Sequence, residues 1–278
     1  ESLDCEFYIN DAGNQIKKFY ESVDAVKKGI DIPEDGYHGN YIKHLATLDE
    51  DPLEVNIKNQ KVVLNKLGVE FENWFRESEL HQNKKVDQAT VLLKEKNLVY
   101  ESDGAIWFKS TLFNDTKDRV LKKSSGEFTY FAVDIAYHHH KVLRNYDNLI
   151  AIWGADHHGY IARIEGAINA LNANQQTTNL VGQLVSLSRD GEPVRMSKRT
   201  GEMITLEEVV DEIGIDATRY FLIQKSMDSH INFDLELAKR KSNENPIFYI
   251  QYASARIAQI FNKVEGSKKF TPNSEELA

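Results

Sequence analysis

The chain has 278 residues, enough to bury a substantial core in one large domain or in two ordinary ones. Its 41% hydrophobic and 28% charged residues are typical of a soluble globular protein, and no apolar run is long enough to cross a bilayer. The net charge of −9 argues against indiscriminate nucleic-acid binding, but it leaves room for a local basic track that recognises one folded RNA.

Cys5 is the only cysteine, so the sequence excludes an internal disulfide and a thiolate zinc site. A reducing, cytoplasmic setting is therefore expected. Residues 1–4 form neither an initiator start nor a signal peptide, and residues 274–278 begin a new polar segment. We expect the chain to be part of a longer protein.

The first 125 residues alternate between helical and strand-like patterns. Apolar residues at helical spacing predict helices over 16–26, 53–67 and 86–95. Short apolar runs predict strands at 6–9, 69–75, 98–100 and 105–108. Ser102-Asp103-Gly104 separates the last two runs and predicts a hairpin turn.

From residue 129 the predicted order is helix, strand, helix, strand. These elements are expected at 129–143, 149–153, 159–171 and 180–187. A strand, a helix and a parallel strand in this order form a right-handed βαβ unit of a nucleotide-binding sheet. Thr205 and Glu208 then predict a capped helix, and after residue 215 the chain is expected to be almost wholly helical. The pattern indicates an α/β fold with a Rossmann-type parallel sheet, an α+β insertion and an all-helical C-terminal part.

A short basic motif, Arg195-Met196-Ser197-Lys198-Arg199, lies in a predicted loop between the strand at 180–187 and the helix that Thr205 caps. Ser197 offers a hydroxyl and Lys198 a flexible ammonium, which suit a loop that holds a triphosphate, and Met196 can anchor the loop in an apolar seat. The motif alone is typical of a plain surface turn, so its position in the sheet supports the interpretation.

A second motif, Gly154-Ala155-Asp156-His157-His158-Gly159, follows a predicted strand and opens a helix, where doubly wound sheets bind ligands. Asp156 suits ribose hydroxyls, Gly154 allows a nucleotide to approach the backbone, and His157 lies at a helix N-terminus that favours phosphate. The plain alternative is an Asp N-cap with two incidental histidines. A metal-dependent phosphoesterase is another, but it would need several further carboxylates at metal-binding spacing.

Tyr130 and Asp134 lie four residues apart on one predicted helix, so their side chains share a face. A carboxylate beside a phenol is a good receptor for a guanidinium, because it accepts two parallel N–H bonds. From spacing alone, an exposed Asp on an amphipathic helix is the more ordinary interpretation.

Together these segments resemble one family, the arginyl-tRNA synthetases of class I. The resemblance covers about residues 7–264. It rests on several long motifs in the right order: Tyr-Ile-Asn-Asp-Ala-Gly-Asn-Gln at 8–15, Lys-Asp-Arg-Val-Leu at 117–121, Thr-Tyr-Phe at 129–131, Asp-Ile-Ala-Tyr-His at 134–138, Trp-Gly-Ala-Asp-His-His-Gly-Tyr at 153–160, and the basic motif.

The resemblance implies activation of L-arginine by ATP to arginyl-adenylate, followed by transfer to the 3′ end of tRNA(Arg). It implies that Mg²⁺ comes with ATP, that no metal is bound by the protein itself, and that the enzyme is a monomer. The implied catalytic residues are Arg195, Ser197 and Lys198. The implied arginine-binding residues are Tyr130, Asp134 and His158. The implied ATP-binding residues are Gly154, Asp156, His157, Met196 and Lys198.

One family signature, His-x-Gly-His, is missing from the sequence and is expected to precede residue 1. The chain is therefore expected to be a central fragment that is inactive alone. Its parts are expected as follows: a Rossmann-type core at 1–80 and 126–205, an insertion at 81–125, a helical segment at 206–242, and the start of a helical anticodon-binding domain at 243–278. A synthetase-derived module that binds nucleotides without catalysis, and a class I synthetase for another amino acid, are further alternatives.

Overall fold

The computed structural model of the chain describes residues 3–171, 176–194 and 204–263. These residues form two compact units. One comprises 3–171, 176–184 and 226–230, and the other comprises 185–194, 204–225 and 231–263. In this described part of the chain, no helix combines the length and the apolar character that a membrane span needs.

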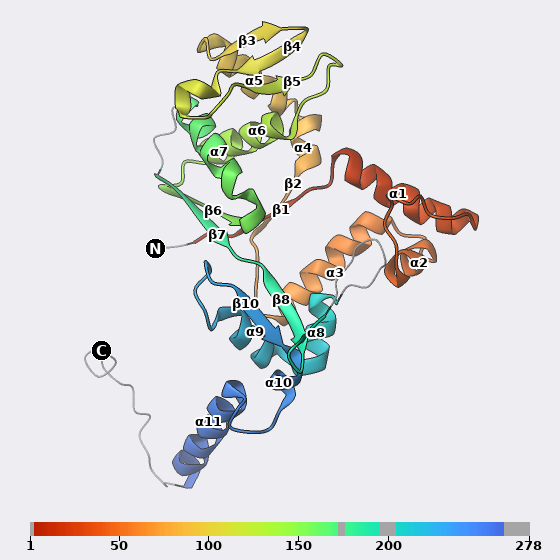
Figure 1. Cartoon of the computed structure of the whole chain (residues 1–278), viewed down its shortest axis with the longest axis vertical. Helices are drawn as coiled ribbons and strands as arrows, with labels where there is room; N and C mark the ends of the chain where they lie inside the picture. Colours follow the sequence, from red (N-terminus) through yellow and green to blue (C-terminus); the bar gives the residue numbers. More distant parts are fainter. Residues whose placement is uncertain (1–2, 172–175, 195–203, 264–278) are drawn as a thin grey trace. The chain divides into compact units, whose positions relative to one another are not determined.

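The first unit is a mixture of helices and short sheets (Figure 1). Its strands are β1 (Glu6–Ile9), β2 (Asn73–Arg76), β3 (Val99–Ser102), β4 (Ala105–Phe108), β5 (Arg119–Lys122), β6 (Asn148–Gly154) and β7 (Gln176–Gly182). Its helices are α1 (Gly13–Lys28), α2 (Asn40–Ala46), α3 (Pro52–Lys66), α4 (Glu77–Gln82), α5 (Lys85–Glu95), η1 (Ser110–Phe113), α6 (Tyr130–Val142), η2 (Ala155–His157) and α7 (His158–Ala170). β1 pairs in parallel with β2 and β6 with β7, whereas β3, β4 and β5 are antiparallel.

The helices expected from apolar spacing are confirmed as α1, α3, α5, α6 and α7. Side-chain capping explains the starts of two of these helices. Asp51 accepts the backbone N–H groups of Leu53 and Glu54 at the start of α3, where Pro52 needs no N–H partner. Thr129 caps α6 through the N–H of Ala132.

The predicted βαβ unit is confirmed by β6, α7 and β7. The two strands run parallel in register from Asn148↔Gln176 to Gly154↔Gly182, and α7 connects them. Their carboxyl ends therefore meet at one edge, at Gly154 and Gly182. The end of β1, at Ile9, similarly lies beside the end of β2, at Arg76.

The predicted hairpin of β3 and β4 is also confirmed. Its turn residues, Asp103 and Gly104, both have positive φ, at 53° and 73°. Two left-handed residues in succession match the right-handed twist of the flanking strands. The hairpin and β5 pack beside α5 and α6, and Leu93, Phe108 and Ile135 in this part of the core are at most 1% exposed.

The second unit surrounds a small sheet in which β8 lies between β10 and β9. Its elements are β8 (Val185–Arg189), β9 (Glu192–Pro193), α8 (Leu206–Ile213), α9 (Ile215–Ile223), β10 (Ile231–Asp234), α10 (Leu235–Lys239) and α11 (Pro246–Lys263). The capping box of Thr205 and Glu208 at the start of α8 is confirmed.

Two predictions for this region are wrong. The single strand expected at 180–187 is two strands, because the N–H of Gln183 turns to the carbonyl of Met227 and β8 then pairs with β10. The part from 206 onward is not all-helical, since it contains β10. Ile231 and Phe233 are buried on one face of that strand and alternate with polar residues, a pattern that indicates a strand.

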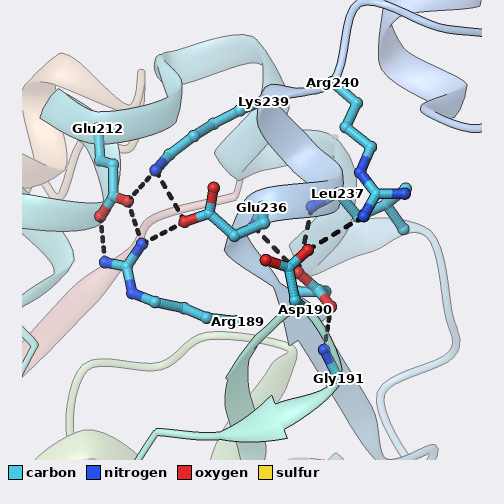
Figure 2. Close-up of polar contacts among 9 residues, drawn as sticks. Arg189, Asp190, Gly191, Glu212, Glu236, Leu237, Lys239 and Arg240 are labelled. Carbon is cyan, nitrogen blue, oxygen red and sulfur yellow. Dashed lines mark hydrogen bonds and ion pairs between the residues drawn. The ribbon is translucent and has the colours of Figure 1, made fainter.

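Ion pairs connect the end of β8 to α8 and α10 within the second unit (Figure 2). Arg189 donates to both carboxylate oxygens of Glu212, at 2.5 and 2.8 Å, and to Glu236 at 2.7 Å. Lys239 lies 2.5 Å from Glu212 and 3.0 Å from Glu236, which completes a ring of alternating charge. The Arg189 and Lys239 hydrogen bonds lower the pKa of Glu212 to about 2. The network therefore fixes β8, which precedes the basic motif in the sequence, against α8 and α10.

Candidate active site

A cleft of about 1670 Å³ in the first unit is lined by β1, by β6 and by one face of α6. The start of α4, at Glu77, and the start of α7, at Tyr160, also line it. The carboxyl ends of β1 and β6 therefore contribute to the same cleft, which is the position where ligands bind in α/β proteins.

Asp134 lies on the α6 face of this cleft and is part-buried. Its Oδ2 accepts a hydrogen bond of 2.5 Å from the hydroxyl of Tyr160, on α7. Burial raises the pKa of the Asp134 carboxyl to about 6, an effect that the negative charge of Glu77 reinforces and the Tyr160 hydrogen bond opposes. The ionised form of a buried carboxyl group with a raised pKa is stabilised by a cationic ligand.

Glu77 is a second acid in the same cleft and is only 5% exposed. Its Oε2 accepts a hydrogen bond of 2.9 Å from the hydroxyl of Tyr8, on β1. Burial raises the pKa of Glu77 as well. We call Glu77 and Asp134 the carboxyl pair, since both acids line the same cleft and the negative charge of Glu77 raises the pKa of Asp134.

Glu77 was not among the predicted site residues. It follows the carboxyl end of β2, which runs parallel to β1, so the two strand ends bring it beside the Tyr8–Gln15 motif. An acid two residues after the strand predicted at 69–75 was the available signal. Two polar residues of that motif hold it, because Tyr8 binds Glu77 and Asp11 binds the adjacent Ser78.

Tyr130 lines the cleft together with Asp134, although 62% of Tyr130 is exposed. Its ring lies close to Gly13, where a Cβ would be 3.7 Å from the Tyr130 hydroxyl. Gly13 also has a φ of +82°, a conformation that a side chain would strain. The glycine of the Tyr8–Gln15 motif thus lets the chain turn beside Tyr130.

Gly154, Asp156 and His157 lie together where β6 ends, although only His157 of the three lines the cleft. A Cβ at Gly154 would be 2.6 Å from Oδ1 of Asp156, so a larger residue would displace that carboxylate. Asp156 is exposed and lies 3.6 Å from Nε2 of His157. The arrangement leaves the Asp156 carboxylate accessible to a polar ligand.

Arg195, Met196, Ser197 and Lys198 lie outside the described residues, and the side chain of His158 is likewise not described. Within residues 3–171, 176–194 and 204–263, no group of three or more His, Cys, Asp or Glu side chains is arranged to hold a metal ion.

Comparison with known proteins gives a consistent result. The family described as tRNA synthetases class I (R), catalytic domain, matches residues 23–263. Arginine–tRNA ligase 1 of Halalkalibacterium halodurans is 45% identical over 285 residues, which cover 93% of this chain and 51% of that protein. The chain thus spans about half the length of the curated relatives it matches.

Comparison with solved structures gives the same result as comparison with the sequences. A Campylobacter jejuni structure described as an arginyl-tRNA synthetase matches with a TM-score of 0.81 and 36% identity, over 94% of this chain and 62% of that one. The arginyl-tRNA synthetase of Thermus thermophilus matches with a TM-score of 0.70 over 98% of this chain and 59% of that one. Its identity of 16% supports a shared fold only.

Proposed function

The chain belongs to the family of class I tRNA synthetase (R) catalytic domains, and on that premise we propose that the complete protein is an arginine–tRNA ligase. It activates L-arginine with ATP, forming arginyl-adenylate and pyrophosphate, and passes the arginyl group to the 3′ end of tRNA(Arg). The observation that supports this most directly is the carboxyl pair in the cleft, Glu77 and Asp134.

A guanidinium suits this pair better than other amino-acid side chains do. It is always charged and presents five N–H donors in a planar fork, so it can bind two carboxylates at once. A neutral side chain of the same shape would leave both acids without a counter-charge, which is strongly penalised in a buried site. Tyr130 and His158 are proposed to complete the arginine pocket.

The nucleotide is proposed to bind at the end of β6. Asp156 would contact the ribose hydroxyls, Gly154 would allow close approach of the nucleoside, and His157 would face phosphate near the start of α7. ATP brings Mg²⁺ as its counter-ion. In the basic motif, Lys198 would stabilise charge on the triphosphate with help from Ser197 and Arg195, while Met196 would seat the loop.

The domain organisation follows the same proposal. A Rossmann-type core would comprise 1–80 and 126–205, with an insertion at 81–125. Residues 206–242 would connect this core to a helical anticodon-binding domain, of which residues 243–278 would form the start. We propose a monomer that works in the cytoplasm.

The direct test is ATP–pyrophosphate exchange by the complete protein, measured with each standard amino acid in turn and with and without tRNA(Arg). Of the standard amino acids, only L-arginine should support exchange. Asp134→Asn, which keeps the size of the side chain but removes its charge, should lose at least about 100-fold in kcat/KM for arginine, as expected for breaking a buried charged contact. Asp35→Asn is the matched control, because Asp35 is an exposed acid that forms an ion pair with Lys18. Exchange with another amino acid, and none with arginine, would refute the proposal.

A further inference from the structure

Each member of the carboxyl pair is bound by a tyrosine hydroxyl from another element. Tyr160 on α7 donates to Oδ2 of Asp134, and Tyr8 on β1 donates to Oε2 of Glu77. Both tyrosines are part-buried and line the same cleft. Burial and the neighbouring acid raise the pKa of both phenols well above the usual range, so both remain hydroxyl donors at physiological pH.

We infer that Tyr8 and Tyr160 are positioning residues of the arginine pocket, which fix the rotation of the Glu77 and Asp134 carboxyl groups and leave one oxygen of each for the guanidinium. The inference rests on the proposed function, because it assigns how the proposed arginine pocket is preorganised. A carboxyl group bound at one oxygen before the ligand arrives loses less freedom on binding, so its contact with the ligand is stronger.

The effect of the tyrosine hydroxyl groups can be tested separately from the packing of the tyrosine rings. The ring of Tyr160 contacts Phe131 and Trp153, with centroids 6.1 and 6.2 Å away. The ring of Tyr8 contacts Phe75 and Tyr137, at 6.0 and 4.5 Å. Substitution by phenylalanine keeps these ring contacts and removes only the donor.

The charged surroundings of each acid determine how the variants should respond to pH. Asp134 faces Glu77 on α4, His157 on η2 and Lys141 on its own helix, besides Tyr160. Among these, the Tyr160 hydrogen bond is the largest influence that lowers the pKa of Asp134, so removing it should raise that pKa further.

For Glu77, the facing groups are Tyr8 on β1, His81 on α4 and Asp11 after β1. Nε2 of His81 lies 4.0 Å from Oε1, beyond hydrogen-bonding distance, whereas the Tyr8 hydroxyl lies 2.9 Å from Oε2 and hydrogen-bonds to this carboxyl group. Loss of that bond should likewise raise the pKa of Glu77.

Tyr137 provides a matched control in the same cleft. Its hydroxyl donates to Glu6, an acid that Arg144 already neutralises with two hydrogen bonds of 2.8 and 2.9 Å. Tyr137→Phe therefore removes the same kind of donor from a carboxyl group outside the carboxyl pair. It should leave arginine affinity unchanged.

The experiment is calorimetric titration of the complete protein with L-arginine and, separately, with ATP, across a range of pH. Tyr160→Phe and Tyr8→Phe should each weaken arginine binding on the order of tenfold, the usual effect of losing a hydrogen bond to a charged group, and leave ATP affinity unchanged. In Tyr160→Phe the pH at which arginine affinity falls to half should move upward. Tyr137→Phe should match the wild type in every respect.

The outcomes separate the inference from the proposed function. If the wild type binds arginine selectively but Tyr160→Phe and Tyr8→Phe behave as Tyr137→Phe does, the positioning role is wrong and the proposed function stands. Equal weakening of arginine and ATP, with no shift in the pH profile, would indicate a structural role and also overturn the inference. If the wild type does not prefer arginine, the proposed function itself fails.

Discussion

Asp11 and Ser78 tie the loop after β1 to the first turn of α4. Oδ1 of Asp11 accepts the backbone N–H of Ser78 at 2.8 Å, and Oδ2 accepts its hydroxyl at 2.7 Å. The Asp11 side chain is only 4% exposed, so both bonds are shielded from water. Since Glu77 precedes Ser78, this contact sets where one acid of the carboxyl pair lies.

Removing this contact should cost stability. Asp11→Ala leaves the N–H and the hydroxyl of Ser78 without their acceptor, and an unsatisfied buried group costs about 1–3 kcal/mol. The free energy of unfolding in urea should fall by that amount, and arginine affinity should fall with it. Asp35→Ala, at an exposed acid, should change neither quantity. An unchanged free energy of unfolding in Asp11→Ala would show that Asp11 does not hold α4.

Asp134 should reduce the stability of the free protein at neutral pH. Burial raises its pKa from 3.8 to about 6, so the folded state holds this proton more tightly than the unfolded state does. Its contribution to stability is complete below pH 3.8 and is lost as the pH rises through about 6. Asp134→Asn should therefore increase the free energy of unfolding by on the order of 3 kcal/mol above about pH 6, and it should change that free energy little below pH 3.8. Urea titrations at both ends of the range measure this difference, and a variant less stable at high pH would contradict the assignment.

Arginine binding should release protons near pH 6. At that pH about half of the Asp134 carboxyl groups are protonated in the free protein, and a bound guanidinium favours the ionised form. Calorimetry in buffers of different ionisation enthalpy should detect up to about half a proton released per arginine from this group, and almost none two pH units higher. Asp134→Asn should remove this contribution. Identical proton release in that variant would assign the titration to another group.

The packing of α7 against η1 depends on Gly166. A Cβ at this position would lie 2.8 Å from the Cβ of Phe113, too close to the backbone for a simple side-chain movement. Gly166→Ala should therefore destabilise the protein by about 1–3 kcal/mol, although alanine favours helix. Gly159→Ala lies on the same helix, where the new methyl group would meet no described atom within 4 Å beyond its chain neighbours and its own helix backbone, so it should be neutral or stabilising by up to about 1 kcal/mol. Equal unfolding free energies for the two variants would contradict this account of the packing.

Much of the fold could be predicted from periodicity and capping. The spacing of Ile16, Phe19 and Val23 identifies α1, and the Thr205–Glu208 box identifies the start of α8. The break after Gly182 could not be predicted in this way, because it depends on a bond to Met227, far along the chain. The prediction also missed β10, although Ile231 and Phe233 alternate there with polar residues.

The candidate site was predictable only in part. Tyr130 and Asp134 share a helix, so their common face follows from helical spacing. Glu77 joins them only through the parallel pairing of β1 and β2, a contact between residues about 67 positions apart such as Glu6 and Asn73. The two tyrosine–carboxyl bonds need the folded positions of β1, α4, α6 and α7 together.

The central claim is that the carboxyl pair selects a guanidinium by its charge. Its most direct test is the binding of L-arginine and of L-citrulline, its neutral isostere, to the wild type and to Asp134→Asn of the complete protein. The wild type should prefer arginine by at least about 100-fold, and Asp134→Asn should reduce that preference to about tenfold or less, by reducing arginine binding. An Asp134→Asn variant that keeps the full preference for arginine would contradict the claim.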